Sequence, residues 1–296
     1  MSNPVQTLSI GTKRVIPCAP CVCRDRGRFI GREAELRLAL AGWSADRGKS
    51  PSAPLVVGEP GVGKTRLARE LARITGQDLY VLWGNEDVTA DDLVVSVRES
   101  DHPDRRIDYV LSPLGTAVVR GGICLLDEIG ELRPSALAVL LSLLDDQRAL
   151  FVPLLGETLA VHPAFRLIAT MNHSDSLAAL LPPKLARRLR PVIRMAPADP
   201  EELLQVMADA GLESGSDRSL IRHFWKRWGE LRPGIQPTPS DVIDILGLAQ
   251  GLAAVPFPHP PGTGSEDRPL TRELLDQAMV AVLREVEEND ALPESA

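Results

Sequence analysis

Residues 58–65 read Gly-Glu-Pro-Gly-Val-Gly-Lys-Thr and match the pattern G-x-x-x-x-G-K-[ST] in full. In such a loop, glycines let backbone N–H groups turn inward around a phosphate, and the positive N-terminus of the following helix faces the same anion. The apolar run 55–57 before the loop predicts a buried strand, and the amphipathic stretch 64–75 after it predicts a helix. A chance glycine loop is the alternative, and the strand–loop–helix context argues against it.

The loop predicts a nucleotide site with a divalent cation. Lys64 is expected to reach the outer phosphates, and the Thr65 hydroxyl is expected to bind Mg²⁺. The residues of this segment that we expect to contact the nucleotide are Gly58, Glu59, Pro60, Gly61, Val62, Gly63, Lys64, Thr65 and Arg66.

A second motif further along the chain supplies two acids. Residues 123–126 are apolar, Ile-Cys-Leu-Leu, and Asp127 and Glu128 follow them. A buried parallel strand would deliver both acids to the carboxyl edge of a sheet, where ligands bind in such folds. We expect Asp127 to hold Mg²⁺, directly or through water, and Glu128 to orient and deprotonate an attacking water. Acids after strands are common, so the complete loop upstream gives this pair its weight.

Strands and helices alternate as far as residue 195. Predicted strands besides 55–57 are residues 79–83, 123–126, 167–170 and 192–195, and residues 151–161 are expected to form a hairpin around a glycine. This alternation predicts an α/β fold with a five-stranded parallel sheet sandwiched by helices. The charged stretch 103–109 is expected to be a loop.

After residue 195 the pattern predicts helices only. Asp199, Pro200 and Glu202 form a strong helix start, with a capping acid, a proline at the first position and a glutamate at the third. Further helices are expected at 217–228, 240–252 and 271–288. We therefore predict four parts: a flexible cysteine-containing tail at 1–24, an α/β core at 25–198, a small all-α lid domain at 199–288 and an acidic tail at 289–296.

Composition argues against two classes of partner. The chain has 33 basic and 40 acidic residues, a net charge of −7, which opposes non-specific binding to nucleic acid. No apolar run approaches the roughly 20 residues that span a bilayer, and the first 17 residues lack the apolar block of a signal peptide. We therefore expect no membrane partner and a cytoplasmic location.

Three of the four cysteines cluster near the start, at Cys18, Cys21 and Cys23. A closed zinc site needs four ligands, so we favour reduced thiols over a metal site. Cys124 lies in the apolar run of a predicted strand and is expected to be a buried hydrophobic residue.

Taken together, the motifs resemble those of AAA+ ATPases, in particular the MoxR and dynein-related branch with its CbbQ/NorQ-like members. The resemblance covers roughly residues 29–250. It rests on the loop 58–65, on residues 121–129, on Phe-Arg-Leu-Ile-Ala-Thr-Met-Asn at 165–172 and on the segment 181–189. It implies a P-loop NTPase fold, hydrolysis of ATP with Mg²⁺, and assembly into a ring, by analogy a hexamer.

The resemblance also implies two further catalytic residues. Asn172 matches the polar residue that helps to place the attacking water, although a simple turn asparagine is the alternative. Arg188 matches the arginine finger that a neighbouring subunit supplies to stabilise charge in phosphoryl transfer. Arg187 is its rival, Leu189 stands where phenylalanine is usual, and a solvated basic helix end is the alternative.

Three more features follow from the resemblance. Ile30 and Gly31 match the segment beside the adenine, and the hairpin 151–161 matches an insertion that tends to face the ring pore. The branch usually has an arginine at the start of a lid helix, where this chain has Asp241. The sensor arginine is therefore absent, the register differs, or an arginine elsewhere, Arg227 or Arg232, replaces it.

Three hypotheses of function remain. The first is an ATP-driven ring that remodels or activates a partner protein, such as a client or a protein with a von Willebrand factor A domain. The second is a nucleotide-dependent assembly switch with little turnover, supported by Asp241. The third is the motor subunit of a DNA-restriction complex, which a preference for GTP over ATP would favour.

Overall fold

The computed structural model describes residues 7–22, 28–44, 52–100, 103, 105–145, 148–172, 181–213, 217–254 and 269–290, with side chains of the last helix as far as 283. Contacts divide the chain into two units. The core unit comprises Met1–Asp25, Arg32–Pro60 and Lys64–Met195, and the helical unit comprises Arg26–Gly31, Gly61–Gly63 and Ala196–Ala296.

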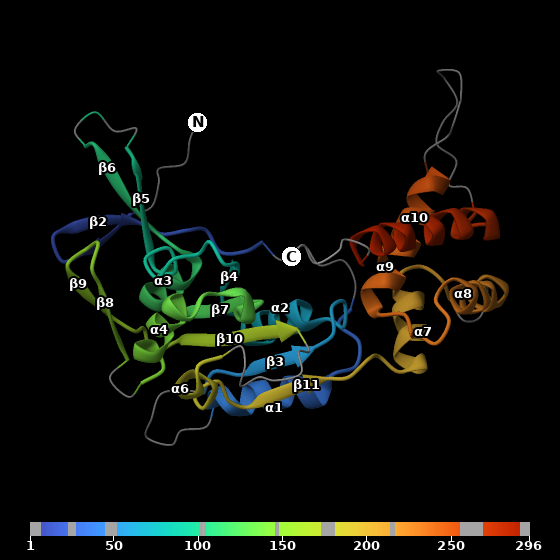
Figure 1. The fold of residues 1–296 in the computed structure, drawn as a ribbon, viewed down its shortest axis with the longest axis horizontal. Helices are drawn as coiled ribbons and strands as arrows, with labels where there is room; N and C mark the ends of the chain where they lie inside the picture. Colours follow the sequence, from blue (N-terminus) through green and yellow to red (C-terminus); the bar gives the residue numbers. More distant parts are fainter. Residues whose placement is uncertain are drawn as a thin grey trace, which may run out of the picture. The chain divides into compact units, whose positions relative to one another are not determined.

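A five-stranded, all-parallel sheet forms the centre of the core unit, as predicted (Figure 1). Its strands are β3 (Leu55–Gly58), β4 (Leu79–Trp83), β7 (Gly122–Asp127), β10 (Phe165–Asn172) and β11 (Val192–Met195). Their order in the sheet is β11-β3-β10-β7-β4. The strand before the phosphate loop therefore lies beside β10, and β10 lies beside the strand that ends in the acid pair.

Helices cover the sheet on both faces. They are α1 (Glu33–Ser44), α2 (Lys64–Thr75), α3 (Pro113–Arg120) and α4 (Pro134–Leu143). Along β7, Cys124 and Leu126 belong to one hydrophobic cluster with residues of α3 and α4, whereas Ile123 and Leu125 are equally buried on the other face. Helix α2 packs against β3, β7 and β10. Burial on both faces explains why these strands have continuous apolar sequences.

A second, four-stranded sheet corrects the prediction for the start of the chain. Its order is β1-β2-β6-β5, with β1 (Leu8–Ile10), β2 (Lys13–Ile16), β5 (Val95–Glu99) and β6 (Ile107–Leu111). The described part of the expected tail therefore contains two strands. Val15 is fully buried opposite Tyr109, and the Cys21 amide donates to the carbonyl of Leu79. The expected loop at 103–109 also runs into β6. The pairs β1–β2 and β5–β6 are local and antiparallel, and the parallel pairing of β2 with β6, which is distant in sequence, joins them into one sheet.

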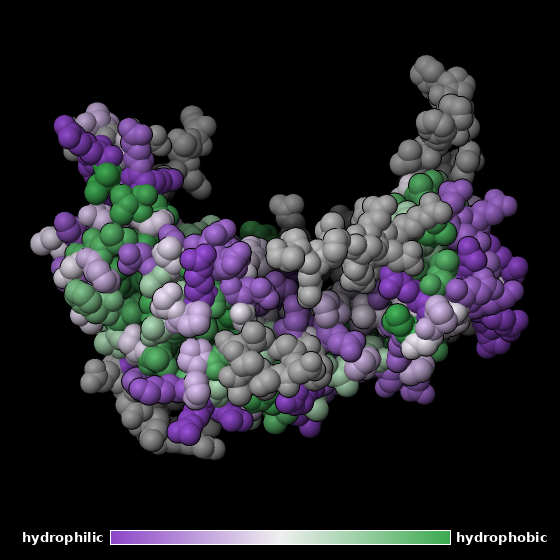
Figure 2. Space-filling model, viewed as in Figure 1, coloured by the Kyte–Doolittle hydropathy of each residue, from purple (hydrophilic) through white to green (hydrophobic). Residues whose placement is uncertain are grey.

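Two hairpins carry exposed apolar side chains. The predicted hairpin forms from β8 (Ala149–Val152) and β9 (Glu157–Ala160), and it exposes Phe151 and Leu154. The antiparallel pair β5–β6 exposes Val97 and Ile107. In Figure 2 hydrophobic surface lies over the β8–β9 hairpin and the base of the β5–β6 hairpin.

The helical unit contains α7 (Pro200–Asp209), α8 (Arg218–Leu231), α9 (Pro239–Ala254) and α10 (Arg272–Asp290). The predicted start of α7 is confirmed, because Asp199 accepts from the Glu202 amide and Glu202 accepts from the Asp199 amide. The core is apolar and includes Phe224, whose ring stacks on that of Trp228.

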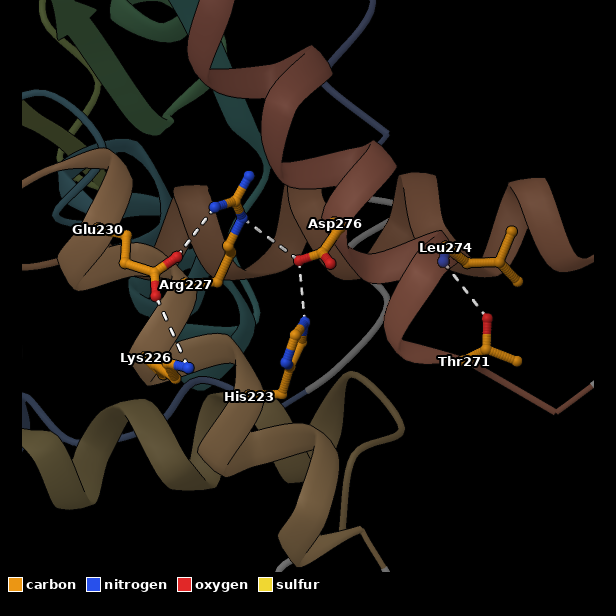
Figure 3. Close-up of polar contacts among 7 residues, drawn as sticks. All are labelled: His223, Lys226, Arg227, Glu230, Thr271, Leu274 and Asp276. Carbon is orange, nitrogen blue, oxygen red and sulfur yellow. Dashed lines mark hydrogen bonds and ion pairs between the residues drawn. The ribbon is translucent and has the colours of Figure 1, made fainter.

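Polar contacts tie α8 to α10 (Figure 3). His223 Nε2 lies 2.9 Å from Asp276 Oδ1, and Arg227 Nε lies 3.5 Å from the same oxygen. Arg227 also pairs with Glu230 at 2.9 Å, and Arg232 donates to the carbonyl of Leu283. Both arginines considered as replacement sensors are therefore engaged within the helical unit.

Two further observations concern the described residues only. None of their helices is long and apolar enough to cross a membrane. They contain no group of three or more His, Cys, Asp or Glu side chains that could hold a metal ion. Cys23 and residues 291–296 of the predicted acidic tail lie outside the described part of the chain.

The buried position of Val15 generates a test of the second sheet. Val15→Asp places an unpaired charge in the core, and we expect it to lower the free energy of unfolding by about 3–5 kcal/mol. Arg14→Asp is the matched control, because Arg14 is exposed on the same strand and should tolerate the change. Denaturant unfolding measures both variants, and equal stability would restore the interpretation of a loose tail.

Candidate functional site

The strand order brings the predicted site residues to one edge of the parallel sheet. Asn172 at the end of β10 is in register with Gly58 at the end of β3, and Ala169 is in register with Leu126 of β7. The carboxyl ends of β3, β10 and β7 are therefore neighbours, and the residues that follow them converge. This is the position at which open α/β sheets bind ligands.

Lys64 is the centre of a set of polar contacts at this edge. Its ammonium donates to the carbonyl oxygens of Gly58 and Glu59 at 2.8 and 2.9 Å, and to Oδ1 of Asn172 at 2.9 Å. Burial lowers the pKa of Lys64, while the negative charges of Asp127, Glu128 and Glu59 act to raise it. The side chain is thus a desolvated cation that is held in place by oxygen acceptors.

Thr65 and Asp127 are joined directly. The Thr65 hydroxyl donates to Oδ2 of Asp127 at 2.7 Å, and the Asp127 side chain is buried. The two predicted cation ligands therefore present oxygen atoms to one point, although they come from different elements.

Glu128 leaves the sheet at a sharp turn. Its backbone is in the left-handed region, at φ 57° and ψ 51°, and its side chain is exposed next to the buried Asp127. Nδ2 of Asn172 lies 3.5 Å from Oε1 of Glu128. Asn172 thus stands between Lys64 and Glu128, which is the position that the predicted role of placing a water requires.

Two residues that sequence reasoning missed support the acid pair. Thr170 is fully buried, donates from its hydroxyl to Oδ1 of Asp127 and accepts from the Glu128 amide at 2.9 Å. The Gly84 amide donates to the carbonyl of Asp127 at 2.7 Å. A Cβ at Gly84 would lie 2.2 Å from the Glu128 carbonyl oxygen, so only glycine fits. The available signals were a hydroxyl two residues before Asn172 and a glycine directly after a strand.

Backbone geometry of the loop agrees with its glycines. Gly61 and Gly63 have φ values of +79° and +100°, which side chains rarely adopt. In the helical unit, the Ser240 hydroxyl donates to the Gly61 carbonyl at 3.1 Å. Val62 is buried, Arg66 is half-buried, and Glu59 and Pro60 are exposed.

Arg188 lies apart from this cluster, at the end of the short helix α6 (Pro183–Ala186). It forms an ion pair with Asp145 and donates to the carbonyl of Lys184. Leu189 beside it is fully buried, whereas Arg187 is exposed. Within the described chain, Arg188 is engaged with Asp145 and not with the acid pair.

The remaining predicted residues belong to the helical unit. Ile30 packs against its hydrophobic core, and a Cβ at Gly31 would meet the Glu202 carboxylate. Asp241 accepts from the Thr238 amide and hydroxyl, both at 2.7 Å, and its own amide donates to Thr238 Oγ1. Asp241 is therefore a capping residue of α9, like Glu202 of α7, and the pattern Thr-Pro-Ser-Asp at 238–241 could have indicated this.

Comparison with known proteins identifies the domain. Residues 54–189 match the description "AAA domain (dynein-related subfamily)". The chain contains an AAA domain of this subfamily. The resemblance inferred from the motifs is thereby confirmed, and the cluster around Lys64 and Asp127 lies within this domain.

Several curated proteins are related to the AAA domain. The denitrification regulatory protein NirQ of Stutzerimonas stutzeri is 36% identical over 40% of this chain and 42% of its own length. Protein NorQ of Paracoccus denitrificans is 31% identical over 57% of this chain and 62% of its own. Protein CbbQ of Hydrogenophilus thermoluteolus is 35% identical over 40% and 43%. The chain therefore spans less than two thirds of the length of these relatives.

Solved structures share the fold. A mutant form of Thermotoga maritima RuvB superposes with a TM-score of 0.56 at 19% identity, covering 87% of this chain and 73% of that protein. Another structure of that RuvB, described as a Holliday junction branch migration motor, gives a TM-score of 0.51 at 19% identity, with 87% and 72% covered. At such identity the likeness concerns the fold alone.

The AAA domain implies Mg²⁺ beside the nucleotide, and the donor set fits this ion. The Thr65 hydroxyl and the Asp127 carboxylate are hard oxygen ligands, 2.7 Å apart. Mg²⁺ prefers few protein carboxylates together with phosphate oxygens, so two protein ligands suffice.

The close approach at Gly84 generates a test of how the acid pair is held. Gly84→Ala forces the Asp127–Glu128 backbone to move, because the obstacle is a carbonyl oxygen and not a flexible side chain. We expect weaker Mg²⁺-dependent nucleotide binding and a lower melting temperature. Gly229→Ala is the control, since a Cβ meets nothing within 4 Å there and alanine should stabilise helix α8 by about 0.5–1 kcal/mol. Unchanged binding in Gly84→Ala would show that the glycine is dispensable.

Proposed function

We propose that this chain binds ATP with Mg²⁺ and hydrolyses it. The observation that carries the proposal is the cluster at one sheet edge, where Lys64, Thr65 and Asp127 lie within hydrogen-bonding distance of their partners and Glu128 lies next to them. A desolvated cation, a pair of hard oxygen ligands and an exposed carboxylate are the parts that phosphoryl transfer to water requires.

Each side chain has a defined task in this proposal. Lys64 exchanges its carbonyl acceptors for phosphate oxygens and stabilises their negative charge. Thr65 and Asp127 hold Mg²⁺, which neutralises phosphate charge when it is bound. Glu128 accepts the proton of the attacking water, and Asn172, 3.5 Å from its carboxylate, orients that water.

The position of Arg188 supports action on a neighbouring copy. In a single chain it pairs with Asp145, on a turn fixed by two buried residues, Leu185 and Leu189. We propose that Arg188 serves the site of the adjacent subunit in a ring, a hexamer by analogy with the branch. Arginine suits this task because its planar group stays charged and offers several donors.

The work of such a ring is directed at a protein. Exposed Phe151 and Leu154 on the β8–β9 hairpin offer apolar contacts to a client or to a von Willebrand factor A domain partner. One matched relative is described as a denitrification regulatory protein, which agrees with a role in activating other proteins. We propose a cytoplasmic, chaperone-like factor of this kind.

A nucleotide-dependent assembly switch with little turnover is the second candidate. Its support is Asp241, which caps helix α9 at the position where a sensor arginine is usual. An aspartate in place of that arginine supplies no positive charge to the γ-phosphate, and in this proposal hydrolysis is slow while binding stays intact.

Steady-state hydrolysis separates the two candidates. We expect wild-type activity per subunit to rise with protein concentration, and Glu128→Gln to lower it by about 100- to 10,000-fold while ATP still binds. Glu131→Gln is the control, because this nearby acid is exposed in the short helix after the pair and should be inert. Tight ATP binding with negligible wild-type turnover at every concentration would favour the switch.

Mixing two inactive variants tests the trans arrangement. Arg188→Ala keeps Glu128, and Glu128→Gln keeps Arg188, so a mixed ring contains interfaces with both groups intact. We expect each variant alone to be inactive and the mixture to recover a measurable fraction of wild-type hydrolysis, because an arginine finger contributes about 10³–10⁵ in rate. Arg187→Ala tests the rival and should stay active. A mixture that remains inactive would place the arginine in its own subunit's site or remove its role.

A further inference from the structure

We propose that Thr170 is a positioning residue for both acids of the pair, an inference that rests on the proposed reaction with Mg-ATP. Thr170 occupies the point where the pairing of β10 with β7 ends. The last paired residues are Ala169 and Leu126, so Thr170 and Asp127 are the next neighbours across the two strands. The threonine side chain is fully buried.

The hydroxyl of Thr170 has two partners with fixed directions. It must accept from the Glu128 amide, at 2.9 Å, because a backbone N–H only donates. It must donate its proton to Oδ1 of Asp127, because an ionised carboxylate only accepts. One hydroxyl thus binds the side chain of the first acid and the backbone of the second.

This arrangement fixes the rotation of the Asp127 carboxylate. With Oδ1 bound to Thr170, Oδ2 faces Thr65, whose hydroxyl donates to it at 2.7 Å. Thr170 therefore turns Oδ2 towards Thr65, the other proposed ligand of Mg²⁺. Such outer partners orient metal-binding carboxylates in many proteins.

The same hydroxyl also holds the turn that presents Glu128. Glu128 has a left-handed backbone conformation, which residues other than glycine adopt only when their surroundings enforce it. Beyond Ala169 the strand pairing no longer supplies an acceptor for the Glu128 amide, and Thr170 replaces it. The position of the proposed base thus depends on Thr170.

The test compares a variant that keeps the shape of the side chain and loses its hydroxyl with variants that keep a hydroxyl or a thiol. Thr170→Val removes both hydrogen bonds, Thr170→Ser retains them, and Thr170→Cys supplies only a weak donor and a weak acceptor. Thr116→Val is the matched control. Thr116 lies on helix α3 and is also fully buried, and its hydroxyl accepts from the Cys18 amide at 3.0 Å. Thermal melting of every variant establishes that it is folded.

The deciding readout is the Mg²⁺ dependence of binding to a non-hydrolysable, fluorescent ATP analogue. For Thr170→Val we expect the Mg²⁺ concentration of half-maximal effect to rise about 10- to 100-fold. Binding without Mg²⁺ should stay unchanged, because the contacts of Lys64 are untouched. Thr170→Ser and Thr116→Val should behave like wild type. If Thr170→Val fails to fold, we expect Thr170→Cys to raise the Mg²⁺ concentration of half-maximal effect above that of the wild type, by a smaller factor than the one given for Thr170→Val.

The inference fails if folded Thr170→Val, or Thr170→Cys in its place, shows wild-type Mg²⁺ dependence. A loss of thermal stability without this change would mean that Thr170 has a structural role only. Failure of the proposed function gives a different result, because then neither the wild type nor any variant at position 170 would hydrolyse ATP. If wild type does not bind the analogue at all, the proposed function and this inference fail together.

Discussion

Burial of the Asp127 carboxylate is the constraint on which the site depends. A charge taken out of water is costly unless polar groups replace the water, and here hydroxyls from two different elements do so. One comes from Thr65 on α2 and the other from Thr170 on β10. These partners are available only because β10 lies between β3 and β7 in the sheet. The hydrogen bonds that stabilise the Asp127 carboxylate therefore require this strand order.

The ammonium group of Lys64 is also a charge that burial destabilises. Burial lowers the pKa of Lys64, and the nearby acids counter this effect. Its hydrogen bonds to Gly58, Glu59 and Asn172 hold it at the edge of the sheet where we propose that the outer phosphates bind. The site thus has its charges placed before a ligand arrives, and little reorganisation is needed to stabilise a charged transition state.

The parallel sheet, the loop and the acid pair could be predicted because their signals are local. Strands buried on both faces give continuous apolar runs, and the loop has a fixed spacing. The second sheet could not be predicted, since β2 reads Lys-Arg-Val-Ile and its place in the sheet depends on pairing with the distant β6. The role of Thr170 could not be predicted either, because threonine is common in strands. Its role emerges only once Asp127 lies beside it.

The ion pair between Arg188 and Asp145 must be weighed against the proposed trans role. Both side chains are partly exposed, at 32% and 52%, and such surface pairs contribute only about 0–1 kcal/mol. A finger that accelerates hydrolysis by about 10³–10⁵ stabilises the transition state by roughly 4–7 kcal/mol. Releasing Arg188 from Asp145 therefore costs far less than its action on a neighbour gains. The ion pair between Arg188 and Asp145 in the single chain therefore does not oppose the proposed role of Arg188 in a neighbouring subunit.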